Sequence, residues 1–432
     1  MRLRSPHDRQ ILLLAVPALG ALAAEPLYVL VDTAIVGHLG TTQLASLAIA
    51  ATVMTTAFTI FNFLTYGTTA QVARLHGAGR EAAAAGLGSQ ALWLGLAIGV
   101  VLLVLIEALA GPLVTLMGGT GRVHDGAVLY LRIAALGGPF FMLAGAAQGF
   151  LRGISDLKTP LVVLVCAHAA NALLELLFVY GFDWGLAGSA WGTVVAQAGM
   201  ALAFVAVQRR AGFERPHPAK MRPLARIGSE IAVRPTALTG SFLVASAVLA
   251  RIGAASLGAH QVAFQLWVFL ALILDAIAVA GQVMVGRMLG AGDALGARAA
   301  STRMIGWSVA IGALFAVVLL ALGDTVPRLF TGDAAVVARA HEIWPLFAAM
   351  MPANGAVFAL DGILIGAGDT RYLMWGMLAA AAVYVPITLL ALHNGWGIVG
   401  VWWGLLALIA VRLGVCAARF AGSRWALTGA PA

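Results

Sequence analysis

The feature of this sequence that most constrains its fold is the recurrence of long apolar segments. We identify twelve of them along the 432 residues, each long enough to cross a hydrocarbon core of roughly 30 Å as a helix of about 20 residues. None shows the two-residue alternation of a membrane β-barrel strand. We therefore predict an all-α membrane protein with twelve transmembrane helices.

Composition supports this prediction and excludes other classes. Only 10% of the residues are charged, whereas a soluble domain carries about 25%. The net charge of +8 is spread over short loops, so we expect no nucleic-acid partner. Cys166 and Cys416 both lie in apolar segments and predict neither a disulfide framework nor a metal site. The predicted spans cover residues 11–36, 44–72, 86–117, 127–151, 160–181, 185–208, 229–251, 257–286, 301–323, 334–365, 372–392 and 396–418.

The amino-terminal segment resembles a secretory signal, with a basic start, an apolar middle and small residues. Its apolar run continues to about Val36, which is too long for a cleaved signal, so we expect it to be retained as the first span. Most basic residues fall in loops on one side, and by the positive-inside bias that side is cytoplasmic. We predict a plasma (inner) membrane protein with both termini in the cytoplasm. The opposite side keeps Arg122, Arg132, Arg251, Arg328 and Arg339.

The chain is predicted to contain two copies of a six-span unit. Residues 148–160, QGFLRGISDLKTP, match residues 361–373, DGILIGAGDTRYL, at an offset of 213. WGLAGSAWG at 184–192 matches WGIVGVWWG at 396–404, and the glycines of HGAGREAAA at 76–84 match those of GAGDALGAR at 290–298. The predicted domains are an amino-terminal bundle, 1–208, a cytoplasmic linker, 209–228, and a carboxy-terminal bundle, 229–432. Because six spans is an even number, the bundles should be related by a pseudo-two-fold axis along the membrane normal, with a cleft between them.

These motifs resemble the multidrug and toxic compound extrusion (MATE) family, and specifically its DinF-like branch. The resemblance covers essentially the whole chain, and EPLYVLVDTAIVGHLG, at 25–40, is its most specific piece. It implies two six-helix bundles that export cationic or amphipathic compounds in exchange for H⁺ or Na⁺.

Two carboxylates interrupt the first apolar span. An ionisable residue inside a bilayer costs at least about 2.5 kcal/mol, so a functional role is the default interpretation. Asp32 follows Glu25 by seven residues, which places both on one helix face. Pro17 and Pro26 remove backbone hydrogen bonds and are candidate hinges. The family's first-span aspartate falls on Asp32, so we predict a coupling role for it, although an acid neutralised for packing alone is the alternative. Glu25 fits a coupling residue or a structural partner equally well.

The fifth span carries a second polar face. His168, Asn171 and Glu175 are spaced i, i+3 and i+7, so they share one helix face that should point into the bundle. By the resemblance, Asn171 and Glu175 match an asparagine–aspartate pair with Glu in place of Asp, and Thr193 and Tyr130 match further network members. A structural hydrogen-bond network is the alternative. His168 is a candidate cleft residue that titrates near neutrality or a satisfied core histidine.

Other polar residues are candidates for the substrate cleft. Asn62 and Asp275 occupy equivalent repeat positions, and Gln261 and Gln265 lie one turn apart in the eighth span. Asp361, near the cytoplasmic end of the tenth span, fits a structural role that bridges helix ends.

The sequence favours a proton-coupled antiporter with alternating access, acting as a monomer in membrane lipid on amphipathic or cationic small molecules. No cofactor is expected, with H⁺ as the coupling ion. Na⁺ coupling is one alternative. By the resemblance, some family members hold a cation with a glutamate in the seventh span, but here that span has only Glu230, at its start. A flippase for lipid-linked precursors is another, although the spans hold few basic residues. We find no zinc-protease, nucleophile-elbow or ATP-binding motif, so an enzyme is not expected.

Overall fold

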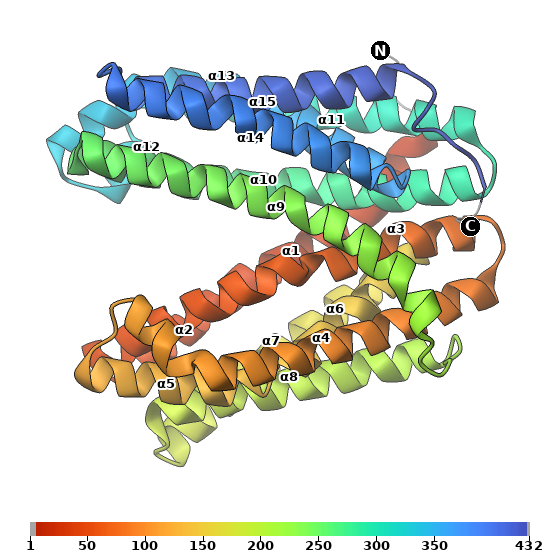
Figure 1. Ribbon diagram of the computed structural model, residues 1–432, viewed down its shortest axis with the longest axis horizontal. Coiled ribbons are helices and arrows are strands. Elements are labelled where there is room, and N and C mark those ends of the chain that lie inside the picture. The colour runs from red at the N-terminus through yellow and green to blue at the C-terminus, as the bar shows by residue number, and fades with distance from the viewer. Residues whose placement is uncertain (1–5, 430–432) are drawn as a thin grey trace. The chain divides into compact units, whose positions relative to one another are not determined.

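The computed structural model describes residues 6–429, and throughout this range the regular secondary structure is helical (Figure 1). Residues 1–5 and 430–432, which belong to the predicted bundles, lie outside the described residues. The predicted cytoplasmic position of the two termini concerns these residues. Eleven helices are long and apolar enough to cross a membrane, and a bent pair of shorter helices brings the number to twelve. The predicted all-α class with twelve spans is confirmed.

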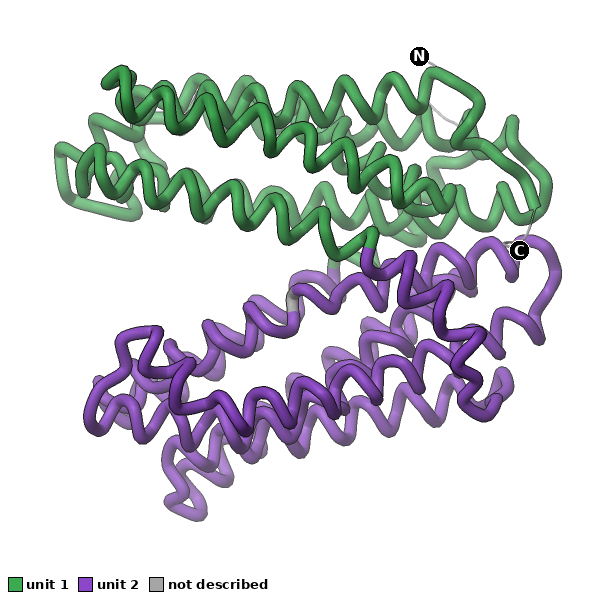
Figure 2. The backbone as a smooth tube through the Cα atoms, in the orientation of Figure 1, with its two compact units in different colours: residues 1–19, 230–430, 432 green, residues 20–229, 431 purple. Residues whose placement is uncertain are grey.

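The chain divides into two compact units (Figure 2). Unit 2 comprises residues 20–229 and unit 1 comprises residues 6–19 with 230–429. The division differs from the predicted one at the first helix, because α1 (Pro6–Gly37) contributes its first turns to unit 1. A physical reason is an ion pair inside unit 1, in which Arg303 donates hydrogen bonds of 2.6 and 2.9 Å to the Asp8 carboxylate.

Unit 2 contains the remainder of α1 and most of the interrupted helices of the molecule. Its second span is broken by a 3-10 turn, its fourth is bent by 47°, and its fifth ends in a π-helical turn. The corresponding predicted spans, 44–72, 127–151 and 160–181, carried no prediction of where the helices are interrupted. Its elements are α2 (Thr41–Thr59), η1 (Ile60–Asn62), α3 (Phe63–Gly77), α4 (Glu81–Leu116), α5 (Gly121–Ala135), α6 (Gly138–Gly153), α7 (Lys158–Leu176), η2 (Leu177–Gly181) and α8 (Gly185–Arg209).

Unit 1 repeats the order of spans with continuous helices. These are α9 (Pro218–Ile252, whose first turns belong to unit 2), α10 (Ala254–Gly290), α11 (Ala294–Ala321), α12 (Val326–Phe330), α13 (Ala334–Gly366), α14 (Thr370–His393) and α15 (Gly397–Ala421). Because α9 begins at Pro218, half of the predicted linker, 209–228, is helical. Proline suits the first helical position, since its missing N–H would have no partner there.

Glycines at equivalent repeat positions allow close helix contacts in both units. A Cβ on Gly149 of α6 would lie 2.7 Å from the Thr65 carbonyl oxygen of α3. In unit 1, a Cβ on Gly362 of α13 would lie 2.1 Å from the Ala278 carbonyl oxygen of α10. Small residues let membrane helices approach closely, and such packing takes the place of the hydrophobic effect inside lipid.

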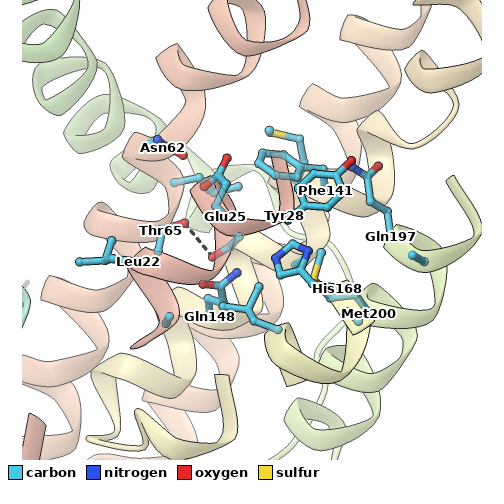
Figure 3. Close-up of a pocket in the computed structure, with 18 of the residues that line it drawn as sticks. Leu22, Glu25, Tyr28, Asn62, Thr65, Phe141, Gln148, His168, Gln197 and Met200 are labelled. Atoms are coloured by element: carbon cyan, nitrogen blue, oxygen red, sulfur yellow. Dashed lines mark hydrogen bonds between the residues drawn. The ribbon is translucent and has the colours of Figure 1, made fainter. Parts of the chain in front are cut away.

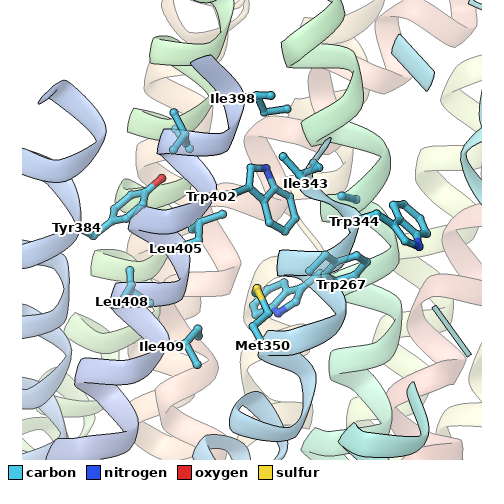
Figure 4. Packing of buried hydrophobic residues seen from close by; sticks show 14 of the residues in the cluster. Trp267, Ile343, Trp344, Met350, Tyr384, Ile398, Trp402, Leu405, Leu408 and Ile409 are labelled. Carbon is cyan, nitrogen blue, oxygen red and sulfur yellow. The ribbon is translucent and has the colours of Figure 1, made fainter. Parts of the chain in front are cut away.

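The interior of unit 1 is apolar and rich in aromatic side chains (Figure 4). Trp402 of α15 packs edge-on against Phe347 with ring centroids 5.6 Å apart, and Trp344 donates a 2.6 Å hydrogen bond to the Leu319 carbonyl oxygen. Tyr384 of α14 is fully buried in the same cluster.

A buried ion cluster ties three helices of unit 1 together. Asp361 of α13 accepts hydrogen bonds from Arg234 of α9 and from Arg412 of α15, the latter at 2.6 Å. Asp361 and Arg412 are each only 5% exposed. This arrangement fits the bridging role predicted for Asp361.

Candidate functional site

The candidate site lies where α7 and α8 of unit 2 approach each other closely. A Cβ on Gly192 of α8 would lie 2.9 Å from Glu175 Cγ, and one on Gly188 would lie 2.7 Å from the backbone of Phe178. Two glycines four residues apart therefore let α8 lie directly against the end of α7 and its π-helical turn. Ser189 and Thr193, each one residue later, are thereby brought against the carboxyl groups described next. Single π-helical turns occur frequently at functional sites.

Two acids are buried together in unit 2. Glu175 is 0% exposed and Asp32 is 6% exposed. Ser189 donates a 2.8 Å hydrogen bond to Asp32 Oδ1, and Thr193 donates one of 3.3 Å to Glu175 Oε1. Ser189 and Thr193 lie one turn apart on α8, so the two carboxyl groups lie along the same face of that helix.

A single hydroxyl connects this acid pair to further polar groups. Thr193 Oγ1 lies 3.3 Å from Asn171 Nδ2 and 3.1 Å from the Tyr28 hydroxyl. A hydroxyl has one proton and two lone pairs, so Thr193 satisfies all three partners by donating to Glu175 and accepting from Asn171 and Tyr28. The chain Glu175–Thr193–Tyr28 thus forms one continuous hydrogen-bonded path.

A cavity of about 170 Å³ lies in unit 2 on the Tyr28 side of this path (Figure 3). Tyr28 stacks on His168 with ring centroids 4.9 Å apart and an interplanar angle of 17°. Thr193 and Asn171 belong to both the acid network and the cavity wall. The wall contains both apolar and polar groups, a mixture suited to amphipathic molecules. The cavity wall also includes Glu25, Asn62, Thr65, Phe141, Met142, Gln148, Arg152, Gln197 and Met200.

The helix breaks of unit 2 border the cavity. Phe61 and Asn62 come from the 3-10 turn, and Phe141 and Met142 follow the bend between α5 and α6. Gln197 of α8 reaches that bend, since a Cβ on Gly137 would lie 2.0 Å from Gln197 Oε1.

The structure brings most of the predicted coupling residues together. Glu175, Asn171 and Thr193 form one hydrogen-bonded network, Asp32 is bound by Ser189 one turn from Thr193, and Tyr130 is buried in the same unit, 5% exposed. Glu25 is separate, because it is exposed and lines the cavity rather than hydrogen-bonding the acid pair.

The predicted cleft residues fall into two groups. His168 and Asn62 line the cavity of unit 2. Gln261 and Gln265 are exposed on α10 and Asp275 is half-buried there, all in unit 1 and outside this cavity. Two of the five predicted cleft residues therefore line the cavity of unit 2, and the other three belong to unit 1.

The predicted hinge prolines lie in an uninterrupted helix. Pro17 and Pro26 are both inside α1, which is helical from Pro6 to Gly37. Inside a membrane protein, neighbouring groups commonly satisfy the carbonyls that a proline leaves free. The interruptions of unit 2 lie elsewhere, as described above.

Several site residues were missed by the sequence reasoning. Tyr28 lies between Glu25 and Asp32 at i+3, and Ser189 lies one turn before Thr193, so helical spacing from the predicted acids would have found both. Gln148 and Arg152, joined by a 3.2 Å hydrogen bond, also line the cavity. Within the described range, no cluster of three or more His, Cys, Asp or Glu side chains is arranged to hold a metal ion.

Comparison with known proteins gives a consistent result. The MatE family model matches residues 17–177 and again residues 231–390. The chain is 28% identical to the Escherichia coli DNA damage-inducible protein F, covering 95% of this chain and 92% of that protein. It is 29% identical to the Arabidopsis thaliana chloroplastic Protein DETOXIFICATION 44, covering 94% and 80%.

Solved structures share the fold. The bent form of the Vibrio cholerae MATE transporter VcmN superposes with a TM-score of 0.88 at 21% identity, covering 98% of this chain and 97% of that one. The double match of the family model reflects the internal repeat, and the predicted resemblance is confirmed. The chain belongs to the MatE family of multidrug efflux transporters, which are multi-pass membrane proteins.

Proposed function

We propose that the protein exports amphipathic or cationic small molecules by proton-coupled antiport. The observation that carries this proposal is the pair of buried acids. Glu175 is connected through Thr193 and Tyr28 to the wall of the cavity, and Asp32 is bound by Ser189, one helical turn from Thr193. An acid held away from water gains or loses H⁺ only with a rearrangement of its partners. A molecule that binds in the cavity acts on the same hydroxyls.

The exchange follows from competition for this shared network. With a proton on one of the two acids, Thr193 and Tyr28 are held in the hydrogen-bonded path described above. A cationic or hydrogen-bonding substrate that engages Tyr28 or Asn171 disturbs the path and favours release of the proton. Conversely, protonation restores the path and expels the substrate. Exposure of the cavity to one side of the membrane and then to the other would complete the cycle.

The acids of unit 1 support H⁺ rather than Na⁺ as the coupling ion. Asp361 is engaged by Arg234 and Arg412, and Glu230 accepts a 2.6 Å hydrogen bond from Thr370. A Na⁺ ion needs free carboxylate and carbonyl oxygens, and the neighbouring guanidinium groups would repel it. A flippase for phosphate-bearing lipid precursors is less favoured, since Arg152 is the only arginine or lysine in the cavity lining.

The remaining features of the proposal concern cellular context. We propose a monomer in the bacterial inner membrane with both termini in the cytoplasm. The asymmetry of basic residues between the two sets of loops supports this orientation.

Reconstituted liposomes test the proposed coupling. Efflux of a cationic dye is measured under an imposed pH gradient, under a Na⁺ gradient and with both, for the wild type and for Asp32→Asn. Asp125→Asn is the matched control, because Asp125 is an exposed acid on α5. We expect the pH gradient alone to drive efflux in the wild type and the control but not in Asp32→Asn. Efflux that follows Na⁺ alone, or that persists in Asp32→Asn, would contradict proton coupling at this site.

A further inference from the structure

The segment that joins α8 to α9 is fixed to unit 2 rather than loose. Gln90 of α4, which is fully buried, donates a 2.9 Å hydrogen bond to the Arg215 carbonyl oxygen and accepts one of 2.8 Å from His217 N. Trp93 donates to the Glu214 carbonyl oxygen at 3.1 Å, and Ser89 accepts from Glu214 N at 3.1 Å. Four hydrogen bonds from one face of α4 therefore hold this backbone in a fixed position. We call residues 209–226 the strap.

The strap presents a concentrated positive charge. It contains one acid, Glu214, whose carboxylate is bound by Lys220 at 2.7 Å. Six basic side chains project from the strap and all are exposed: Arg209, Arg210, Arg215, Lys220, Arg222 and Arg226.

An exposed aromatic ring lies among these charges. Phe213 is 41% exposed, and Arg209 Cζ lies 5.1 Å from the centre of its ring. Trp93 of α4 packs beside Phe213 with ring centroids 5.8 Å apart. Aromatic rings and basic side chains together are typical of segments at the level of the lipid headgroups.

The length of α9 places the strap at this level. Its 35 residues extend about 52 Å as a helix, whereas about 20 residues suffice to cross the hydrocarbon core. The surplus lies at the start of α9, because that end carries Lys220, Arg222 and Arg226. These side chains therefore emerge from the membrane beside the end of α8.

We propose that the strap is a binding site for anionic phospholipid headgroups, with phosphatidylglycerol as the test lipid. Each basic side chain near a negatively charged membrane surface contributes to attraction, and clusters of four to eight next to a membrane helix are typical of such sites. The hydrogen bonds to α4 fix the backbone of residues 214–217 between the basic ends of α8 and α9, which reduces the entropic cost of ordering this segment on binding.

A purely topological role for these charges makes a different prediction. Charges that only set the orientation of the chain during insertion need no lipid of a particular headgroup afterwards. A headgroup site, by contrast, retains anionic lipid in the folded protein, and the retention depends on these side chains and on ionic strength.

Lipid retention by the purified full-length protein distinguishes the two. Detergent-solubilised protein is titrated with phosphatidylglycerol or phosphatidylcholine, and bound lipid is counted by native mass spectrometry. The test variant is Arg210→Gln/Arg215→Gln/Arg222→Gln. The control is Arg122→Gln/Arg328→Gln/Arg339→Gln, which removes three exposed charges distant in sequence from the strap. A charge-preserving variant with lysine at 210, 215 and 222 tests for effects on folding.

The proposal expects preferential retention of phosphatidylglycerol by the wild type, the control and the lysine variant. In the test variant this preference should fall at least about tenfold, since three charges are lost. Equal retention of the two lipids by the wild type would overturn the proposal, as would a test variant that behaves like its control. Displacement of the lipid by an equal concentration of inorganic phosphate would overturn it too, by assigning the site to a soluble anion.

Discussion

Units 1 and 2 repeat one order of spans but differ in what they bury. The second repeat has Thr388 where the first has Glu175, and Leu405 where the first has Thr193, by the offsets of 213 and 212. Both glycines that bring α8 against α7 have counterparts in unit 1, and a Cβ on one of these, Gly404, would lie 3.2 Å from the Tyr384 ring. The close helix contact is therefore common to both units, whereas only unit 2 uses it to hold a pair of acids.

The cavity shows the same contrast. Gln148 and Met200 line the cavity of unit 2, and their counterparts in unit 1 are Asp361 and Arg412 of the buried ion cluster. At these two positions unit 2 has neutral side chains beside a cavity, whereas unit 1 has a buried ion pair.

The two units also differ in the continuity of their helices. The 3-10 turn in the second span and the 47° bend in the fourth both belong to unit 2. Their counterparts α10 and α13 are continuous, although α13 contains Pro345 and Pro352. Unit 2 therefore combines the interrupted helices with the buried acids and the cavity, whereas unit 1 combines continuous counterparts with a buried ion cluster.

The largest effect should come from removing the second acid of unit 2. Glu175→Gln keeps the size of the side chain but removes the exchangeable proton, so we expect efflux driven by a pH gradient to fall at least about tenfold. The measurement is dye efflux from liposomes. The matched change in unit 1 is Thr388→Val, at the equivalent buried position, and should leave the pH dependence unchanged. An equal loss of pH-driven efflux in both variants would contradict the assignment of proton coupling to unit 2.

The next effect concerns the ion cluster of unit 1. Asp361→Asn leaves Arg234 and Arg412 without a counter-charge, and breaking a buried pair in this way costs about 3–5 kcal/mol. Denaturant unfolding in detergent measures the loss. Asp324→Asn, which removes an exposed acid of the same unit, should stay within about 0.5 kcal/mol of the wild type. Unchanged unfolding of Asp361→Asn would show that the cluster does not stiffen unit 1.

A smaller effect should follow from filling the glycine contacts that both units share. Overpacking a close contact costs about 1–3 kcal/mol, and the backbone neighbour of Gly362 lies closer than that of Gly149. Gly362→Ala should therefore destabilise more than Gly149→Ala. Gly199→Ala and Gly414→Ala are the controls, because a Cβ at either helical position meets nothing within 4 Å. If the control changes destabilised the protein as much, the loss of stability would not be caused by close packing at Gly149 and Gly362.

The sequence predicted those features of the fold that depend on local pattern. Apolar length determines the number of spans, and the repeated glycine motifs reveal the duplication at a nearly constant offset. The acid pair was predictable because carboxyl groups are conspicuous in an apolar run, and helical spacing places Asn171 and Glu175 on one face.

The interruptions of unit 2 were harder to predict. The 3-10 turn at Ile60–Asn62 contains neither proline nor glycine, so it reflects packing around the cavity rather than local preference. The bend after α5 did carry a signal, Gly137-Gly138-Pro139, within an otherwise apolar segment. Pro17 and Pro26, the predicted hinges, lie inside the continuous helix α1, so proline alone does not mark where helices are interrupted.

The smallest effect should separate substrate binding from proton coupling within unit 2. Glu25 is exposed to the cavity, and a solvated ion pair contributes at most about 1 kcal/mol, which is roughly a fivefold change in affinity. Glu25→Gln should therefore raise the KM for a cationic dye by up to about fivefold and leave the KM for a neutral substrate unchanged. Because Glu25 does not hydrogen-bond the acid pair, the dependence of efflux on the pH gradient should persist, unlike in Glu175→Gln. Glu81→Gln, at an exposed position outside the cavity, is the control. If Glu25→Gln abolished the response to the pH gradient, Glu25 would belong to the coupling network, and the separation of cavity and acid pair would be wrong.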